Sequence, residues 1–283
     1  MSIMFSRIIW SDNTVLKDVS TSLNNYKSGT LVLPLVAAED FIYIGSDFPF
    51  NHRYIDVKVA NDQTAGINVH LWDANGWKAA NDVIDQTSIG GISLSQSGVL
   101  SWVKAEREVW ARWDTNNEGE QIEGLTGLNI LNMYWARLTF TGNLDVLTEI
   151  EYLGHKFSDD ADLDILYPDL TRTAVKVQFK AAKTDWKLQH IQAAEEIIKD
   201  LKNRSIIKSK NQILDWELFT DAAVHKVAEI AFNAFGKDFA EEKAAAAGEY
   251  KKELNKAVYN VDLNNNATLD TAERTFRQGI LYR

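Results

Sequence analysis

The fold is indicated first by residues 54–72, YIDVKVANDQTAGINVHLW. At the start of this stretch Ile55, Val57 and Val59 alternate with polar residues, and INVHLW at its end repeats the alternation. A two-residue period is typical of a strand that buries one face. The intervening NDQTAG is rich in residues that favour turns. The stretch therefore predicts two half-buried strands separated by a turn.

The same alternation recurs through residues 1–155, for example in WARLTF at residues 135–140. Turn-forming segments such as DANG, SQSG and TNNEGE separate the apolar runs. Short strands joined by frequent turns are typical of antiparallel sandwiches and barrels. We therefore predict an N-terminal antiparallel β-sandwich domain, jelly-roll-like, over residues 1–155.

From residue 186 onwards the apolar residues recur every three or four positions, as in Ile191, Ala194, Ile198 and Leu201. This is the period of an amphipathic helix. Two further stretches of this kind follow, FTDAAVHKVAEIAFNAFG and DFAEEKAAAAGEYKKELNKAVYN. We predict an α-helical domain over residues 186–283.

Residues at the ends of these helical stretches suggest their boundaries. Thr184 or Asp185 is placed to cap the first helix and Thr220 the second, because short oxygen-bearing side chains accept bonds from free helix amides. Gly236 follows the second helix, where a left-handed residue commonly ends one.

Between the two regions, residues 156–185 are dense in aspartate and contain the helix breaker Pro168, which predicts an acidic connector or arm. Its AVKVQF segment is compatible with a last strand or with the start of a helical arm. The complete pattern is that of an α+β protein with two domains.

The composition excludes several classes of protein. The chain of 283 residues has no cysteine, so disulfides, zinc–thiolate sites and thiol nucleophiles are absent from it. Its net charge of −10 repels phosphate backbones, and we expect no specific nucleic-acid partner. No apolar run approaches the roughly 20 residues that span a bilayer, and Arg7 interrupts the N-terminal stretch where a signal peptide would be apolar. We expect neither a membrane partner nor an export signal.

Residues 262–273, DLNNNATLDTAE, have the spacing of a calcium-binding EF-hand loop between two helical stretches. Such a loop places oxygen ligands at its positions 1, 3, 5, 7, 9 and 12. The candidate ligands are Asp262, Asn264, Asn266, Thr268 through its backbone carbonyl, Asp270 and Glu273.

The loop departs from that pattern at Ala267, where glycine normally adopts a positive φ at no steric cost. The alternative is an Asn-rich connection whose side chains satisfy backbone groups. We expect no required cofactor, with Ca²⁺ as the one candidate metal. Its role would be to hold the C-terminal helix.

Catalytic patterns are not evident in the sequence, and we predict no enzymatic activity. The histidines do not fall at metal-ligand spacing, and the sequence has no phosphate-binding P-loop, nucleophile elbow or H-E-x-x-H motif. The aspartates between Asp159 and Asp169 have two interpretations: solvated charges on a connector, or carboxylates that hold a cation or act as glycosidase acids.

Seven tryptophans lie in the predicted β-sandwich, and two interpretations compete for them. They are either large core residues or an exposed, coplanar platform on which sugars stack. These residues are Trp10, Trp72, Trp77, Trp102, Trp110, Trp113 and Trp135.

Residues 75–103 and 125–142 resemble a sequence pattern found in virion proteins of tailed bacteriophages. The pattern consists of Trp, D-x-T, Leu, a small-residue turn ending in Gly and a second Trp, followed later by a Tyr-Trp-x-Arg-Leu strand. The matching residues are Trp77, Asp85, Thr87, Leu94, Gly98, Trp102, Tyr134, Trp135, Arg137 and Leu138. Residues 193–236 resemble, more diffusely, the helical head-to-tail adaptor, connector or neck proteins that dock beneath the portal of such phages.

This resemblance implies a structural virion protein that assembles as an oligomeric ring at the portal and joins capsid to tail. The implied partners are other copies of the chain, the portal protein and tail or neck proteins. The implied location is the virion, after viral assembly in the host cytoplasm. The alternative is a carbohydrate-binding β-sandwich module fused to a helical domain.

Overall fold

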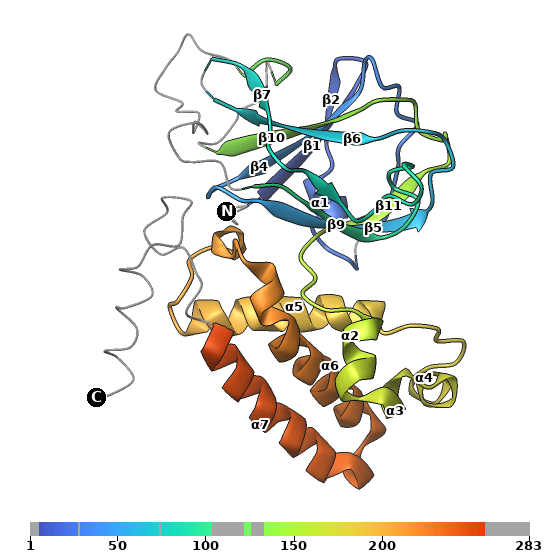
Figure 1. The fold of residues 1–283 in the computed structure, drawn as a ribbon, viewed down its shortest axis with the longest axis vertical. Helices are drawn as coiled ribbons and strands as arrows, with labels where there is room; N and C mark the ends of the chain where they lie inside the picture. Colours follow the sequence, from blue (N-terminus) through green and yellow to red (C-terminus); the bar gives the residue numbers. More distant parts are fainter. Residues whose placement is uncertain (1–5, 28, 74, 104–121, 126–132, 258–283) are drawn as a thin grey trace. The chain divides into compact units, whose positions relative to one another are not determined.

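The computed structural model describes residues 6–27, 29–73, 75–103, 122–125 and 133–257 (Figure 1). Two compact units make up the chain, one ending at Gly154 and the other beginning at His155. The first unit contains two antiparallel sheets and the second is helical, which confirms the predicted α+β fold class.

The six-stranded sheet has the order β2-β1-β4-β10-β6-β7, with every pairing antiparallel. Its strands are β1 (Ser6–Asp12), β2 (Val15–Asp18), β4 (Phe41–Ser46), β6 (Ile67–Trp72), β7 (Trp77–Ala79) and β10 (Tyr134–Phe140). The short helix α1 (Ser20–Leu23) follows β2.

The five-stranded sheet has the order β3-β11-β5-β9-β8 and is also antiparallel throughout. Its strands are β3 (Leu31–Val32), β5 (His52–Val59), β8 (Ile84–Asp85), β9 (Gly98–Ser101) and β11 (Glu149–Gly154). The two strands predicted from residues 54–72 are β5 and β6. They belong to different sheets, so the intervening turn carries the chain from one sheet to the other.

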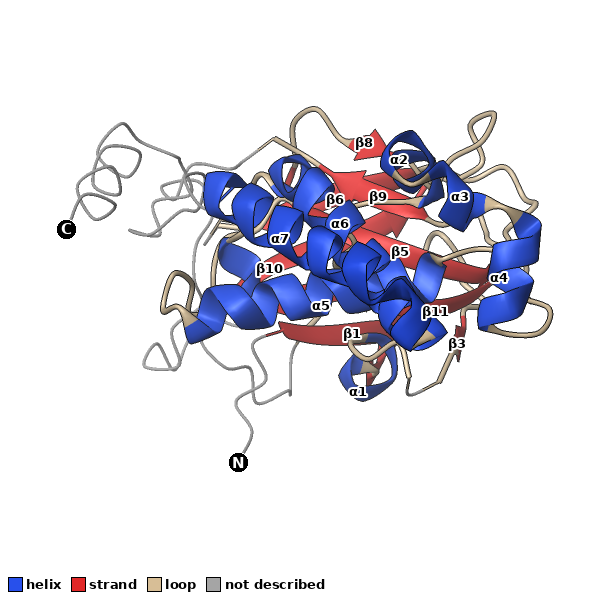
Figure 2. Cartoon of the chain, turned by 90° about the horizontal axis from the view of Figure 1, so that it is seen from below, coloured by secondary structure: helices blue, strands red, loops and turns tan. Residues whose placement is uncertain are grey.

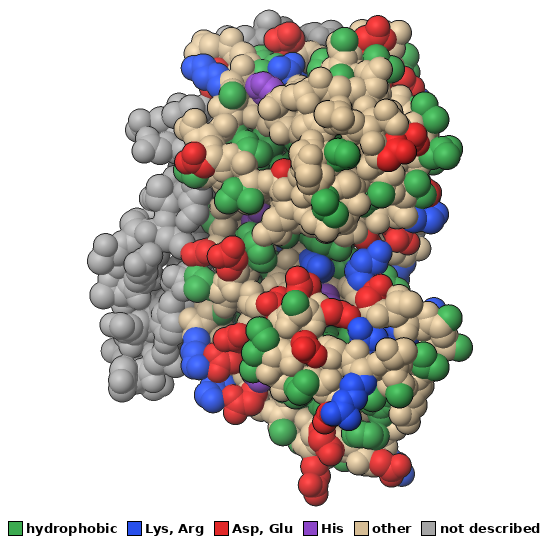
Figure 3. Space-filling model, turned by 45° about the vertical axis from the view of Figure 1, so that its right-hand side comes forward, with side chains coloured by type: hydrophobic (Ala, Val, Ile, Leu, Met, Phe, Trp, Pro, Cys, Tyr) green, Lys and Arg blue, Asp and Glu red, His purple; other side chains and the backbone are tan. Residues whose placement is uncertain are grey.

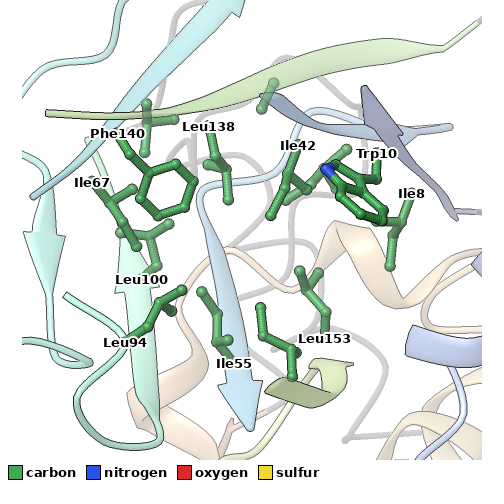
Figure 4. Packing of buried hydrophobic residues seen from close by; sticks show 14 of the residues in the cluster. Ile8, Trp10, Ile42, Ile55, Ile67, Leu94, Leu100, Leu138, Phe140 and Leu153 are labelled. Atoms are coloured by element: carbon green, nitrogen blue, oxygen red, sulfur yellow. The ribbon is translucent and has the colours of Figure 1, made fainter. Parts of the chain in front are cut away.

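Apolar residues from both sheets meet in a core between them. Leu138 and Ile42 point from the six-stranded sheet toward Ile55 and Leu153 of the other sheet (Figure 4). Of the alternating residues at the start of the 54–72 stretch, Ile55 is buried, whereas Val59 at the end of β5 is 38% exposed. Full burial of such a side chain stabilises the fold by roughly 1.5–3 kcal/mol.

In the helical unit, α6 packs against both α5 and α7 (Figure 2). The α-helices are α2 (Asp160–Leu166), α3 (Pro168–Thr171), α4 (Thr173–Phe179), α5 (Lys187–Asn203), α6 (Thr220–Phe235) and α7 (Ala240–Ala257). Short 3₁₀ turns span Lys210–Gln212, Trp216–Phe219 and Lys237–Phe239. None of the described helices is both long and apolar enough to cross a membrane.

The acidic segment 156–185, expected as a connector, contains α2, α3 and α4 and belongs to the helical unit. Asp159 caps α2 by accepting bonds from the amides of Ala161 and Asp162, and Pro168 is the first residue of α3. A proline at this position lacks only an amide that would be free in any case. AVKVQF lies in α4, so the helical alternative for it is confirmed.

The capping role predicted for Thr220 is wrong. Thr220 is the first residue of α6, and its Oγ1 donates to the backbone oxygen of Phe157 at 2.9 Å instead of accepting from a helix amide. The 3₁₀ turn ending at Phe219 runs directly into α6, so the helix begins without a side-chain cap. Asp185 accepts from the first amide of α5, that of Lys187, although the N-cap residue itself is Trp186.

The sandwich core generates the first prediction. Replacing Leu138, which is 1% exposed, with Ala should lower the free energy of unfolding by about 2–5 kcal/mol, because a cavity replaces lost contacts. Replacing Val146, which is 66% exposed, with Ala should change it by less than about 0.5 kcal/mol. Denaturant titration measures both. An equal effect of the two substitutions would contradict the assigned core.

Candidate docking groove

A cavity of about 290 Å³ opens in the helical unit, where α2, α3 and α4 face the turn between α6 and α7. Apolar and aromatic side chains dominate its lining. The lining residues are Leu166, Tyr167, Pro168, Asp169, Leu170, Val175, Gln178, Phe232, Phe235, Phe239 and Glu242. We call this feature the groove.

Three phenylalanines form one wall of the groove. Phe232 and Phe235 lie on the last turn of α6, and Gly236 ends the helix with a φ of 91°. The following turn brings Phe239 back onto Phe232, with ring centroids 5.9 Å apart and planes 13° from parallel. Phe235 also contacts Phe239, at 5.4 Å between centroids. Mutual aromatic contacts hold the wall in one arrangement.

Tyr167 supports the opposite wall. Its ring lies edge-on to Phe232, 6.1 Å between centroids, and its hydroxyl is 2.8 Å from Nδ1 of His225. Burial lowers the pKa of His225, which keeps the imidazole neutral at pH 7. A neutral Nδ1 can therefore accept from the Tyr167 hydroxyl, and this bond fixes the ring orientation.

The charged residues of the lining are both acidic, Asp169 and Glu242. Asp169 forms an ion pair with Arg172 at 2.8 Å, but the two side chains are 78% and 71% exposed. Water screens such a pair, so it contributes little and exchanges easily. The groove therefore combines an apolar lining with two carboxylates. Apolar side chains also lie among charged ones on the face drawn in Figure 3.

A buried polar network lies elsewhere in the unit, around Asp160. Ser158 Oγ is 2.7 Å from Nδ1 of His190, whose Nε2 is 3.3 Å from Asp160. Lys176 donates to Asp160 at 2.9 Å, and so does the amide of Trp186. Burial raises the pKa of Asp160, but the contacts with His190, Lys176 and the Trp186 amide outweigh it and hold the pKa well below its usual range.

Serine, histidine and aspartate in contact invite comparison with a nucleophilic triad. In such a triad the serine bonds to Nε2 and the carboxylate to Nδ1, whereas here the serine hydroxyl contacts Nδ1 and the carboxylate lies near Nε2. Ser158 and His190 are also only 4% and 1% exposed. The groove lining does not include them. This network ties the start of α2 to α4 and α5.

Other aspartates of the acidic segment also accept hydrogen bonds within the helical unit. Asp162 accepts from the amide of Asp159 and completes the cap of α2, while Asp164 accepts from the hydroxyl of Thr171. The segment is therefore dense in aspartate because these side chains cap a helix and form hydrogen bonds in turns.

The predicted calcium loop, Asp262 to Glu273, lies outside the described residues. Within residues 6–257, apart from the undescribed gaps, no group of three or more His, Asp or Glu residues is arranged to hold a metal ion.

Four of the five described tryptophans predicted in the sandwich are buried. Trp10 and Trp102 belong to the core between the sheets, and Trp72 and Trp135 belong to a second apolar cluster. Trp77 is half-buried, donates to the backbone oxygen of Glu123 and has the Arg137 guanidinium 4.8 Å from its ring centroid. These positions favour the core interpretation. Trp110 and Trp113 lie outside the described residues.

Four of the residues on which the expected phage resemblance was based, Asp85, Thr87, Leu94 and Gly98, have structural roles at the β8–β9 connection. Asp85 accepts from the amide of Thr87 at 2.8 Å and from the hydroxyls of Thr87 and Ser93. Thr87 Oγ1 accepts in turn from the amide of Leu94 at 3.0 Å. A Cβ at Gly98 would lie 2.4 Å from the backbone oxygen of Gln86, so the close approach there requires glycine.

Comparison of the sequence with protein-family models and with curated proteins gives no match.

The groove itself was not predicted from sequence. Its signal is AFNAFGKDF at residues 231–239, where phenylalanines at helical spacing flank a glycine. The sequence pattern marks a buried helix face but not the opposing wall from α2 and α3.

The β8–β9 connection generates a second prediction. Replacing Thr87, which is fully buried, with Val should lower the free energy of unfolding by about 1–3 kcal/mol, because Asp85 and the Leu94 amide each lose a partner. Replacing the neighbouring Ser88 with Ala serves as the control and should have little effect. Thermal and denaturant unfolding measure both, and an unchanged T87V stability would contradict the assigned network.

The Asp160 network generates a third, pH-dependent prediction. Because the pKa of Asp160 is lower in the folded than in the unfolded chain, the unfolded chain binds more protons in acid. The stabilisation is complete above the ordinary carboxyl pKa of about 4 and is lost as the pH falls toward the depressed value. Asp160→Asn should cost about 1.5–3 kcal/mol at pH 7, from the lost charged hydrogen bonds, and less at pH 3.

Denaturant titrations at pH 7 and pH 3 measure this difference. Asp169→Asn, at an exposed ion pair, is the matched control and should cost less than about 0.5 kcal/mol at either pH. A pH-independent effect of Asp160→Asn would show that the carboxylate charge is not the stabilising feature.

Proposed function

We propose that this chain is a structural virion protein of a tailed phage, a head-to-tail adaptor that assembles as a ring at the portal and joins capsid to tail. The observation that carries the proposal is the groove: an open, aromatic-lined cavity in the helical unit. Open apolar cavities of this kind suit the binding of side chains from another protein.

Two further observations support the proposal. The two stretches that resemble phage proteins follow one another along the chain, and the β-sandwich and the helical unit each have apolar clusters of their own. Ring assembly requires such rigid units, because the same surfaces must meet repeatedly at one angle. The polar groups around Asp160 serve to hold helices together, which suits a structural protein.

The carbohydrate-binding alternative calls for an exposed aromatic platform. Among the described tryptophans of the sandwich, Trp77 alone is not buried. A binding module would remain monomeric and change its tryptophan fluorescence with glycans, whereas an adaptor would oligomerise or capture its portal.

The fourth prediction tests the adaptor proposal. Light scattering with negative-stain imaging should show rings of the purified chain, alone or on the portal protein of the same phage. Leu166→Asp places a charge in the groove and should weaken ring formation or portal capture at least tenfold. Ile165→Asp is the matched control, because Ile165 is adjacent, 78% exposed and outside the groove lining.

A chain that stays monomeric and captures no portal would contradict the proposed function. Equal effects of the two substitutions would contradict the role of the groove. Circular dichroism of both variants establishes that they retain the helical fold.

A further inference from the structure

We propose that the groove of one copy binds residues 274–283 of a second copy of this chain. The inference rests on the proposed function as a ring-forming protein and extends it by naming the contact between neighbouring subunits. Three observations support it: the chemistry of the segment, the chemistry of the groove, and the length of chain between α7 and the segment.

Residues 274–283 read RTFRQGILYR and combine apolar and basic side chains. The apolar residues are Phe276, Ile280, Leu281 and Tyr282, and the basic residues are Arg274, Arg277 and Arg283. The segment contains no acidic residue. In a chain with a net charge of −10, a stretch of this composition is a local exception that favours an acidic, apolar partner surface.

The groove has the complementary chemistry. Phe232, Phe235 and Phe239 supply an aromatic wall, while Asp169 and Glu242 supply negative charge without a basic residue in the lining. The volume of about 290 Å³ lies near the lower limit of small-molecule sites and suits a few anchoring side chains of a peptide. The exposed pairing of Asp169 with Arg172 can be exchanged for an incoming arginine at little cost.

The groove and the last described residue lie at opposite ends of α7. Glu242, in the first turn of α7, lines the groove, and the helix continues to Ala257. At 1.5 Å per residue, Ala257 lies about 23 Å further along the axis. The last described residue therefore lies at the end of α7 remote from the groove.

The chain beyond α7 is long enough to reach a neighbour. Residues 258–273 extend at most about 3.3 Å each, so they span up to about 50 Å before residue 274. An arm at one end of a unit and its receptor at the other form a heterologous contact, and repetition of such a contact generates a ring when the rotation closes.

The experiment compares the full chain with a variant that ends at Glu273. Light scattering over a range of concentrations should show oligomers of the full chain and a monomer of the shortened one. A labelled synthetic peptide of residues 271–283 should bind the shortened chain in an anisotropy titration. Glu242→Lys should weaken this binding at least tenfold, while Glu241→Lys, an exposed neighbour outside the groove lining, should leave it unchanged.

Three outcomes would overturn the inference: no peptide binding, equal effects of the two lysine substitutions, or oligomers that persist in the shortened chain. Peptide binding by the shortened chain together with a strictly monomeric full chain would place the segment in its own groove and overturn the role of the second copy. Portal capture by the shortened chain separates the two proposals. If the shortened chain captures the portal while one of the three outcomes above is found, the adaptor function is retained and the proposed subunit contact fails.

Discussion

The end of helix α6 at Gly236 is the constraint on which the groove depends. A φ of 91° lies in a region that residues with a Cβ rarely adopt, and it ends α6 abruptly. The following 3₁₀ turn places Phe239 on Phe232 and starts α7, which packs along α6. Continuation of α6 would carry Phe239 away from Phe232 and leave the groove without one of its walls.

The helical unit is held by polar bonds as well as by apolar packing. Asp159 caps α2, and Asp160 joins Lys176, His190 and the backbone of Trp186. These bonds order the short helices α2 to α4, which would be marginal in isolation. The groove needs them, because Leu166, Tyr167 and Val175 belong to this segment or to its immediate connections.

The β-sandwich obeys a different constraint. Its sheets enclose one apolar core, and the β8–β9 connection closes over that core through Asp85, Thr87 and Leu94. Leu94 is buried and adopts a φ of 60°, a conformation that the surrounding hydrogen bonds maintain. Asp85, Thr87 and Leu94 therefore supply hydrogen bonds and core contacts that shape one connection of the sandwich.

The sequence by itself determined the strand period of the first unit and the helical period of the second, and with them strands such as β5 and β6 and the helices α5 to α7. It also determined the end of α6 at Gly236. These features depend on local alternation and backbone preference. Only the tertiary structure decided that β5 and β6 lie in different sheets, that the acidic segment forms helices, and that Thr220 bonds to Phe157. It also decided the groove, which joins Tyr167 to Phe239. Periodicity reports which face of an element is buried, but what covers that face is set by residues distant in the chain.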